Sequence, residues 1–238
     1  MTHKTIGVLG GMGPWATLDF FEKLLRLTPA KTDQEHLRVI IDNNPKIPDR
    51  SPAIVGTGED PTPALVAGAR ILQQAGADVI VIPCNTAHYF YERVQNAVSI
   101  PVLHIMEEVV STAREEVPSA RVLGILATAA AVSSGLYARA CARKGIEVVN
   151  PDPAGQQVVN RAIYAVKGGQ MGPEITAGLK KIADGLVGRG AQALVLGCTE
   201  LPFVLKPQDV RVPLLDSNQI LARAAVRFAT GVPVPTPT

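Results

Sequence analysis

The chain is poor in aromatic residues and has almost no excess of charge of either sign. Of its 238 residues only 4% are aromatic, and 23 Lys and Arg face 21 Asp and Glu, giving a formal net charge of +2. Nucleic-acid binding is not expected, because it needs aromatic platforms or a basic surface. The chain also lacks an apolar run of about 18 residues, so we expect no transmembrane helix. Its 47% apolar content supports a folded core of one large or two small domains.

Cysteine is scarce as well. Cys84, Cys141 and Cys198 form an odd set without a CxxC pair, so neither a disulfide framework nor a structural zinc site is expected. The Walker A, HExxH and EF-hand patterns are absent too, so no metal is expected. The apolar stretch near the N-terminus is short and broken by glycine, unlike a signal peptide. We therefore predict reduced thiols and a cytoplasmic location.

Short β-branched runs alternate with longer helical stretches along the chain, which predicts parallel strands covered by helices on both faces. A Pro-rich loop is expected at 44–60. The expected strands are 5–10, 37–43, 78–83, 101–104, 121–127, 145–149, 193–197 and 212–215, and the clearest helices are 14–28, 63–75, 88–97, 106–117 and 217–228.

An internal repeat suggests how these elements are grouped. GADVIVIPC at 76–84 and GAQALVLGC at 190–198 lie 114 residues apart, and two shorter strings repeat in the same order at nearly the same separation. The shorter pairs are GVLGG at 7–11 with GILAT at 124–128, and IPVL at 100–103 with VPLL at 212–215. The repeat predicts two similar open parallel-sheet lobes related by a pseudo-twofold axis. We expect lobes at 1–104 and 105–216, with 217–238 packing back on the first.

Cys84 and Cys198 end equivalent strands of the two copies. Ligands of open α/β sheets bind beyond the carboxyl ends of the strands, so the two thiols would approach one cleft from opposite sides. This pattern suits racemisation, in which a thiolate removes the Cα proton from one face and a thiol donates a proton to the other. Thiolate formation needs help, which we expect from helix N-terminal amides after each cysteine. The two thiols should titrate as a unit that holds one proton. Cys141 lies mid-helix and is expected to pack or to lie at the surface, without a function.

The glycine-rich turn supports a different interpretation. Gly11, Gly13 and Ala16 form G-x-G-x-x-A after a strand, and Asp42 ends the next strand, as in a dinucleotide fingerprint. However, Asp42 departs from the usual spacing of about 20 residues, and Pro14 removes an amide next to the phosphate seat. A nicotinamide-dependent oxidoreductase is therefore an alternative, and so is a non-catalytic two-lobed protein that closes on a carboxylate.

Several other polar residues lie near the predicted cleft. Arg50 is in a loop over the carboxyl edge, where ligand-binding side chains often lie, although a solvated charge is the commoner role. Lys167 ends a helix, where a cation is favourable. His88 is one turn beyond Cys84 and could support it. His104 and Asp216 hold matched places after the repeated IPVL and VPLL and could line the cleft.

Three motifs, LGGMGPWAT at 9–17, PCNTAH at 83–88 and LGCTELPF at 196–203, resemble those of the aspartate/glutamate racemase family, particularly its aspartate racemase branch. The resemblance implies a two-lobed α/β fold and homodimers. It also implies racemisation of an acidic amino acid by Cys84 and Cys198, without pyridoxal phosphate or another cofactor. Aspartate is the substrate that it favours, with glutamate or a broader range as alternatives.

The resemblance further assigns residues to the substrate. Arg50 and Lys167 match positions associated with the side-chain carboxylate. The positions for the α-carboxylate and amine match Met12, Asn85, Thr86, Thr128, Thr199 and Glu200. The chain departs from the family pattern at Ala130 and Ala131, where a Gly-Thr pair is usual, so one hydroxyl is missing near the second lobe's ligand turn.

Overall fold

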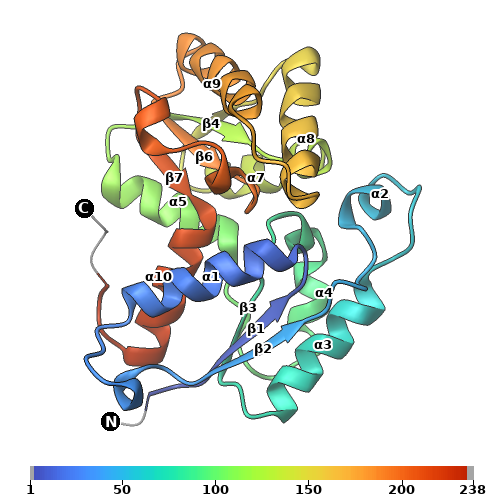
Figure 1. Cartoon of the computed structure of the whole chain (residues 1–238), viewed down its shortest axis with the longest axis vertical. Coiled ribbons are helices and arrows are strands. Elements are labelled where there is room, and N and C mark those ends of the chain that lie inside the picture. The colour runs from blue at the N-terminus through green and yellow to red at the C-terminus, as the bar shows by residue number, and fades with distance from the viewer. Residues whose placement is uncertain (1–2, 235–238) are drawn as a thin grey trace.

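The computed structural model describes residues 3–234, which form two parallel sheets (Figure 1). The first sheet has the order β2-β1-β3 and the second β5-β4-β6-β7. Every strand pair is parallel. The strands are β1 Ile6–Gly10, β2 Val39–Asn43, β3 Val79–Val81, β4 Val122–Leu126, β5 Glu147–Val149, β6 Ala193–Leu196 and β7 Leu214–Asp216. The predicted α/β fold with two parallel-sheet lobes is confirmed.

Helices cover the sheets, and each lobe in Figure 1 is a sheet with its flanking helices. Strands β1, β3 and β6 are buried along their whole length, which explains their nearly continuous apolar sequences. The helices are α1 Pro14–Leu27, α2 Arg50–Ile54, α3 Thr62–Gln74, α4 Tyr91–Gln95, α5 Ile105–Glu116, α6 Ala129–Ser133, α7 Leu136–Ala142, α8 Pro153–Lys167, α9 Pro173–Gly188 and α10 Ser217–Thr230. None of the helices within 3–234 is long and apolar enough to cross a bilayer.

The repeat is visible in the register of the two sheets. Gly7 of β1 pairs with Ile80 of β3, and Gly124 of β4 pairs with Leu194 of β6, so the matched residues occupy equivalent places. Each glycine also lets the segment that precedes the paired strand, β3 or β6, approach closely. A Cβ on Gly7 would lie 2.9 Å from the Ala77 Cβ, and one on Gly124 would lie 3.1 Å from the equivalent atom of the second lobe. The carboxyl ends of β3 and β6 are therefore equivalent positions.

Three local expectations are wrong in detail. The segment at 101–104 forms only one bridge to β3, between Ile80 and Val102, and the Val102 amide, which faces away from β3, donates to the Gln95 side chain. The segment expected as one helix at 88–97 is a 3-10 turn at 86–90 followed by α4. The expected loop at 44–60 contains α2, which the Asp49 side chain caps at its N-terminus.

His104 and Asp216 do occupy matched places, but as helix caps. The His104 side chain accepts a hydrogen bond from the backbone of α5, and the Asp216 side chain accepts two from α10. Asp216 also forms an ion pair with Lys23 at 2.6 Å. The structure thus gives both residues a capping role, and neither is among the residues that line the cavity between the lobes.

The helices that follow the two caps, α5 and α10, lie side by side, and α10 also packs on α1 (Figure 1). Phe20 of α1, Val109 of α5 and Leu221 of α10 belong to one buried cluster that extends through both lobes. The end of the predicted 217–238 segment, at 235–238, lies outside the described residues. The division of the chain at residue 104 stays a prediction.

Candidate active site

A cavity of about 320 Å³ lies where the two lobes meet beyond the strand ends. The first lobe supplies the glycine turn after β1 and the start of α2, and the second supplies Lys167 at the end of α8 and Glu200 after β6. The cavity is lined by Gly11, Met12, Gly13, Pro14, Trp15, Pro45, Ile47, Asp49, Arg50, Lys167 and Glu200. Four predicted substrate residues, namely Met12, Arg50, Lys167 and Glu200, therefore share one cavity.

The glycine turn is not arranged as a dinucleotide site. Gly11 has a φ of 91°, and its amide donates to the Thr17 hydroxyl at 2.9 Å, so this donor is used within the turn. Pro14 starts α1 without an amide. The Asp42 carboxylate lies against α3, where a Cβ on Gly68 would be 2.7 Å from its oxygen. The turn instead holds Met12 at the cavity wall.

The two predicted catalytic cysteines are buried just beyond β3 and β6. Cys84 is 5% exposed and Cys198 is 6% exposed. Their neighbours touch across the lobes: the Thr199 hydroxyl donates to the Pro83 carbonyl at 3.3 Å. Each cysteine segment runs into a short 3-10 turn, and the backbone amide of Glu200, at the start of the second turn, acts to lower the pKa of Cys198 as expected.

Cys198 lies against a carboxylate. Its thiol donates a hydrogen bond to Glu200 Oε2 at 3.0 Å. Burial, and then the negative charge of Glu200, raise the pKa of Cys198 well above its ordinary value, while the Lys167 ammonium opposes the shift. Glu200 is itself 2% exposed, and its second oxygen, Oε1, is buried without a partner among the described residues. The site thus holds a thiol at Cys198 and a free acceptor beside it.

Two cations face this carboxylate. The Arg50 guanidinium donates to the carbonyls of Met12, Ile47 and Pro48 at 3.1–3.3 Å, and its buried Nε has no partner. Burial alone would lower the pKa of Lys167, but negative charge, first that of Glu200 and then that of either cysteine when ionised, outweighs it, so the pKa is raised. Within 3–234 neither cation forms an ion pair. Arg50, expected in an open loop, is instead buried in the first position of α2.

The polar residues that follow Cys84 connect the lobes. Asn85 accepts a hydrogen bond from the Tyr137 hydroxyl at 2.6 Å and donates one to the Ser217 hydroxyl at 2.9 Å. The hydroxyls of Thr86 and Thr128 are bonded at 3.1 Å. Sequence reasoning missed Tyr137, which no periodicity marks as special. It also missed Ser217. The first copy of the repeat has an isoleucine at the matching position, so the hydroxyl of Ser217 was a usable signal.

His88 supports the backbone of Cys84 through a ring nitrogen. Its Nε2 accepts from the Ile105 amide at 3.1 Å, which leaves Nδ1 to donate to the Cys84 carbonyl at 2.9 Å. Burial, with His104 nearby, lowers the pKa of His88 to about 3, so the ring is neutral. Burial raises the pKa of Cys141 to about 11, in keeping with the expected packing role in α7.

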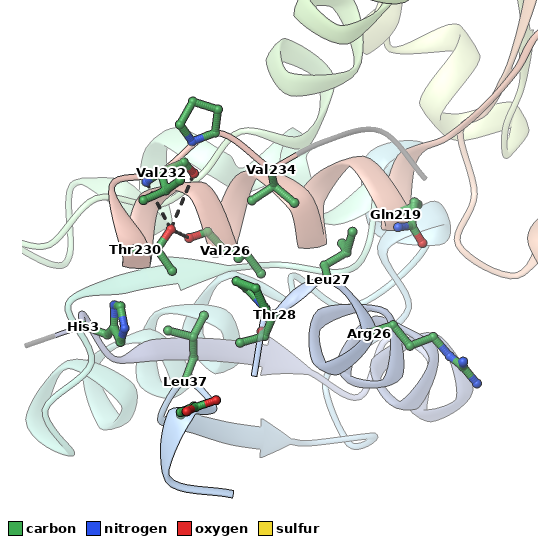
Figure 2. A pocket seen from close by; sticks show the side chains of 13 residues that line it. His3, Arg26, Leu27, Thr28, Leu37, Gln219, Val226, Thr230, Val232 and Val234 are labelled. Carbon is green, nitrogen blue, oxygen red and sulfur yellow. Dashed lines mark hydrogen bonds between the residues drawn. The ribbon is translucent and has the colours of Figure 1, made fainter. Parts of the chain in front are cut away.

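A larger hollow of about 740 Å³ lies at the other end of α1 (Figure 2). Leu27 and Thr28 line it together with Leu37 and Val226, and none of the predicted site residues does. The hollow is mostly apolar. Among the described residues, no cluster of three or more His, Cys, Asp or Glu is placed to hold a metal ion.

The Cys198–Glu200 contact leads to a first prediction. Glu200→Gln should lower the pKa of Cys198, because both the charge and the acceptor bond of Glu200 favour the neutral thiol. The ultraviolet absorbance of the thiolate would be titrated in a chain where Cys84 and Cys141 are alanine. Glu59→Gln, at an exposed glutamate, is the control and should leave the titration unchanged. An unaltered or raised pKa in Glu200→Gln would contradict the assignment.

Comparison with known proteins agrees with this architecture. The family model for Asp/Glu/hydantoin racemases matches residues 9–225. The broad specificity amino-acid racemase RacX of Bacillus subtilis (strain 168) is 32% identical over 227 residues, covering 93% of this chain and 96% of that protein. The structure of Picrophilus torridus aspartate racemase, 32% identical, superposes with a TM-score of 0.81 over 95% of this chain and 94% of that one. A Yersinia pestis structure described as a putative Asp/Glu racemase gives the same TM-score at 26% identity, covering 95% of this chain and 99% of that one. The chain belongs to the Asp/Glu/hydantoin racemase family.

Proposed function

We propose that this chain is an amino-acid racemase that interconverts the enantiomers of an acidic amino acid, aspartate above all, without a cofactor. The observation that carries the proposal is the equivalent placement of Cys84 and Cys198 beyond β3 and β6, with their neighbours in contact through the Thr199–Pro83 hydrogen bond. The activities named for the relatives from B. subtilis and P. torridus support it.

The reaction needs one proton acceptor and one proton donor. A thiolate at Cys84 removes the Cα proton, and the electron pair moves into the adjacent carboxylate. The Cys198 thiol then donates its proton to the opposite face, leaving a thiol at Cys84 and a thiolate at Cys198. The reverse direction uses the opposite protonation states, with the Cys198 thiolate removing the proton and the Cys84 thiol donating one.

The charges around the cavity complement an acidic amino acid. Glu200 Oε1, buried without a partner, suits the substrate ammonium. Arg50 and Lys167, which have no ion pair among residues 3–234, suit the side-chain carboxylate. Arginine can bind a carboxylate through two parallel bonds, while lysine acts as a point charge. The α-carboxylate is assigned to the segments that follow the two cysteines.

Aspartate and glutamate differ by one methylene, which a pocket discriminates by only about 1–3 kcal/mol. We propose aspartate first because the P. torridus relative is an aspartate racemase, although the B. subtilis relative is described as broad in specificity. Homodimer assembly and a cytoplasmic location stay predictions. The direct test is formation of D-aspartate from L-aspartate by the purified chain, with and without nicotinamide cofactor. Tight binding without conversion would support the carboxylate-binding alternative, and cofactor-dependent turnover the oxidoreductase.

A second prediction concerns selection of the side chain. Arg50→Ala should reduce the preference for aspartate over alanine roughly 10- to 100-fold, the range expected for one hydrogen bond to a charged group. The turnover number with alanine should change less than this preference does, because Arg50 does not touch the Cα position in this assignment. The measurement is kcat/KM for both amino acids. Lys46→Ala removes an exposed cation from the same segment and should leave the preference unaltered.

Arg50→Lys refines this test, since it keeps the charge but loses the planar fork. It should give an intermediate preference. If Arg50→Ala retains the full preference for aspartate, the assignment of Arg50 to the distal carboxylate is wrong.

A further inference from the structure

Tyr137 lies between the segments that carry the two cysteines. It belongs to α7 in the second lobe and is 3% exposed. Its hydroxyl donates to the Asn85 side-chain oxygen at 2.6 Å, and Asn85 directly follows Cys84. A side chain of the second lobe therefore holds the residue next to the first lobe's thiol.

The same tyrosine touches the other cysteine segment through its ring. A Cβ on Gly197, the residue before Cys198, would lie 2.8 Å from Tyr137 Cε2. Contact this close requires glycine at the position, so the backbone that leads into Cys198 rests on the ring edge. One side chain thus contacts a neighbour of each cysteine, with its hydroxyl on one side and its ring on the other.

A chain of hydrogen bonds continues from the hydroxyl. Asn85 donates from its amide to Ser217 Oγ at 2.9 Å, and Ser217 donates to the Leu196 carbonyl at 2.7 Å. Leu196 is the last residue of β6, two positions before Cys198. The chain starts at α7, passes through the first lobe at Asn85 and returns to the second lobe's strand, so Asn85 is held from two sides.

We infer that Tyr137 is a positioning residue that fixes the separation of the two catalytic cysteines. Its ring supports the approach to Cys198, and its hydroxyl holds the segment of Cys84 at a set distance from that support. The inference rests on the proposed function, because it matters only if both thiols act on one substrate. Reactions that need two groups aligned on one carbon are sensitive to such spacing, and a misplacement of about 1 Å can lower the reaction rate 100-fold.

The phenol itself is not proposed as an acid or base. Burial raises the pKa of Tyr137 well above its ordinary value, so the hydroxyl stays protonated and acts as a donor to Asn85. Its part in the reaction is thus indirect, through the backbone positions of Cys84 and Cys198.

The test separates the two thiols by using variants that keep only one of them. Cys198→Ala retains Cys84 and Cys84→Ala retains Cys198, and each is followed by solvent-deuterium exchange at Cα of the enantiomer that it serves, at saturating substrate. Adding Tyr137→Phe keeps the ring against Gly197 but removes the hydroxyl. Exchange through Cys84 should fall roughly 10- to 100-fold, and exchange through Cys198 should change less than about threefold.

A matched control is Tyr91→Phe, which also removes a hydroxyl bonded to a partly buried carbonyl, that of Val102 at 3.0 Å. It should leave both exchange rates unaltered. Loss of stability alone would lower both rates together in Tyr137→Phe, so equal loss, or no loss, overturns the inference. If Tyr137→Phe does not fold, Ser217→Ala is measured instead. It frees Asn85 on the other side and should lower exchange through Cys84 more than exchange through Cys198, whose segment also loses the bond of Ser217 to the Leu196 carbonyl.

Failure of the proposed function gives a different result. In that case neither single-thiol variant exchanges deuterium, and the wild-type chain does not racemise aspartate. Exchange in both single-thiol variants with an equal response to Tyr137→Phe leaves the proposed function standing and refutes only the role of Tyr137.

Discussion

Cys84→Ala should abolish racemisation and yet leave deuterium exchange in one enantiomer. The loss of one proton-transfer group should slow inversion by at least about a thousandfold, within the range known for general acid–base groups. Cys198 can still remove the Cα proton that faces it and return a deuteron to the same face, which exchanges hydrogen without inverting the centre. Nuclear magnetic resonance of the Cα proton, with chiral separation of the products, measures both effects.

Cys198→Ala should show the opposite preference, because the proposed mechanism has the two thiols act on opposite faces of the substrate. Cys141→Ala is the control. That thiol is buried in α7, so its removal should cost about 1 kcal/mol in packing and leave the chemistry intact. Substantial inversion in both directions by either single variant of Cys84 or Cys198 would show that the paired-thiol mechanism is wrong.

Gly11→Ala should have the second large effect, on folding and on the site together. Gly11 has a φ of 91°, and a Cβ there would overlap the backbone of Asn44. An L side chain in this conformation costs about 1–2 kcal/mol, and overlap with a neighbouring backbone adds about 1–3 kcal/mol. We therefore expect the free energy of unfolding to fall by about 2–5 kcal/mol in urea denaturation, a large part of the typical 5–15 kcal/mol for a folded protein.

Gly56→Ala separates the two costs. Gly56 has a φ of 76°, but a Cβ there would meet no atom within 4 Å, so only the conformational cost remains. This variant should lose about 1 kcal/mol and keep its activity. Equal losses in the two glycine variants would contradict the packing part of the argument, and full activity in Gly11→Ala would contradict the role of the turn in placing Met12.

The sequence was most informative where two positions could be compared within the chain. The strings at 76–84 and 190–198 predicted two lobes and put Cys84 and Cys198 at equivalent strand ends, and the registers at Gly7 and Gly124 agree with it. The alternation of apolar strands and helices was enough for the fold class, because strands buried on both faces carry a nearly unbroken apolar sequence.

The details that were missed depend on contacts between distant residues. The segment at 101–104 meets β3 at a single bridge, Ile80 with Val102, which no local propensity reveals. His104 and Asp216 were correctly paired by the repeat, yet their roles as caps depend on the exact start of the next helix. Tyr137 meets Asn85 from 52 residues away, so its part in the site became visible only in three dimensions.

The central claim is that two thiols act on opposite faces of one carbon, and its most direct test uses the unaltered chain in heavy water. L-aspartate would be supplied without a cofactor, and both enantiomers would be analysed at low conversion. The D-aspartate formed should carry deuterium at Cα, while the remaining L-aspartate keeps its proton, because the donor on the product side has already exchanged with solvent. Exchange into L-aspartate as fast as D-aspartate appears, or D-aspartate that retains the original proton, would contradict the account.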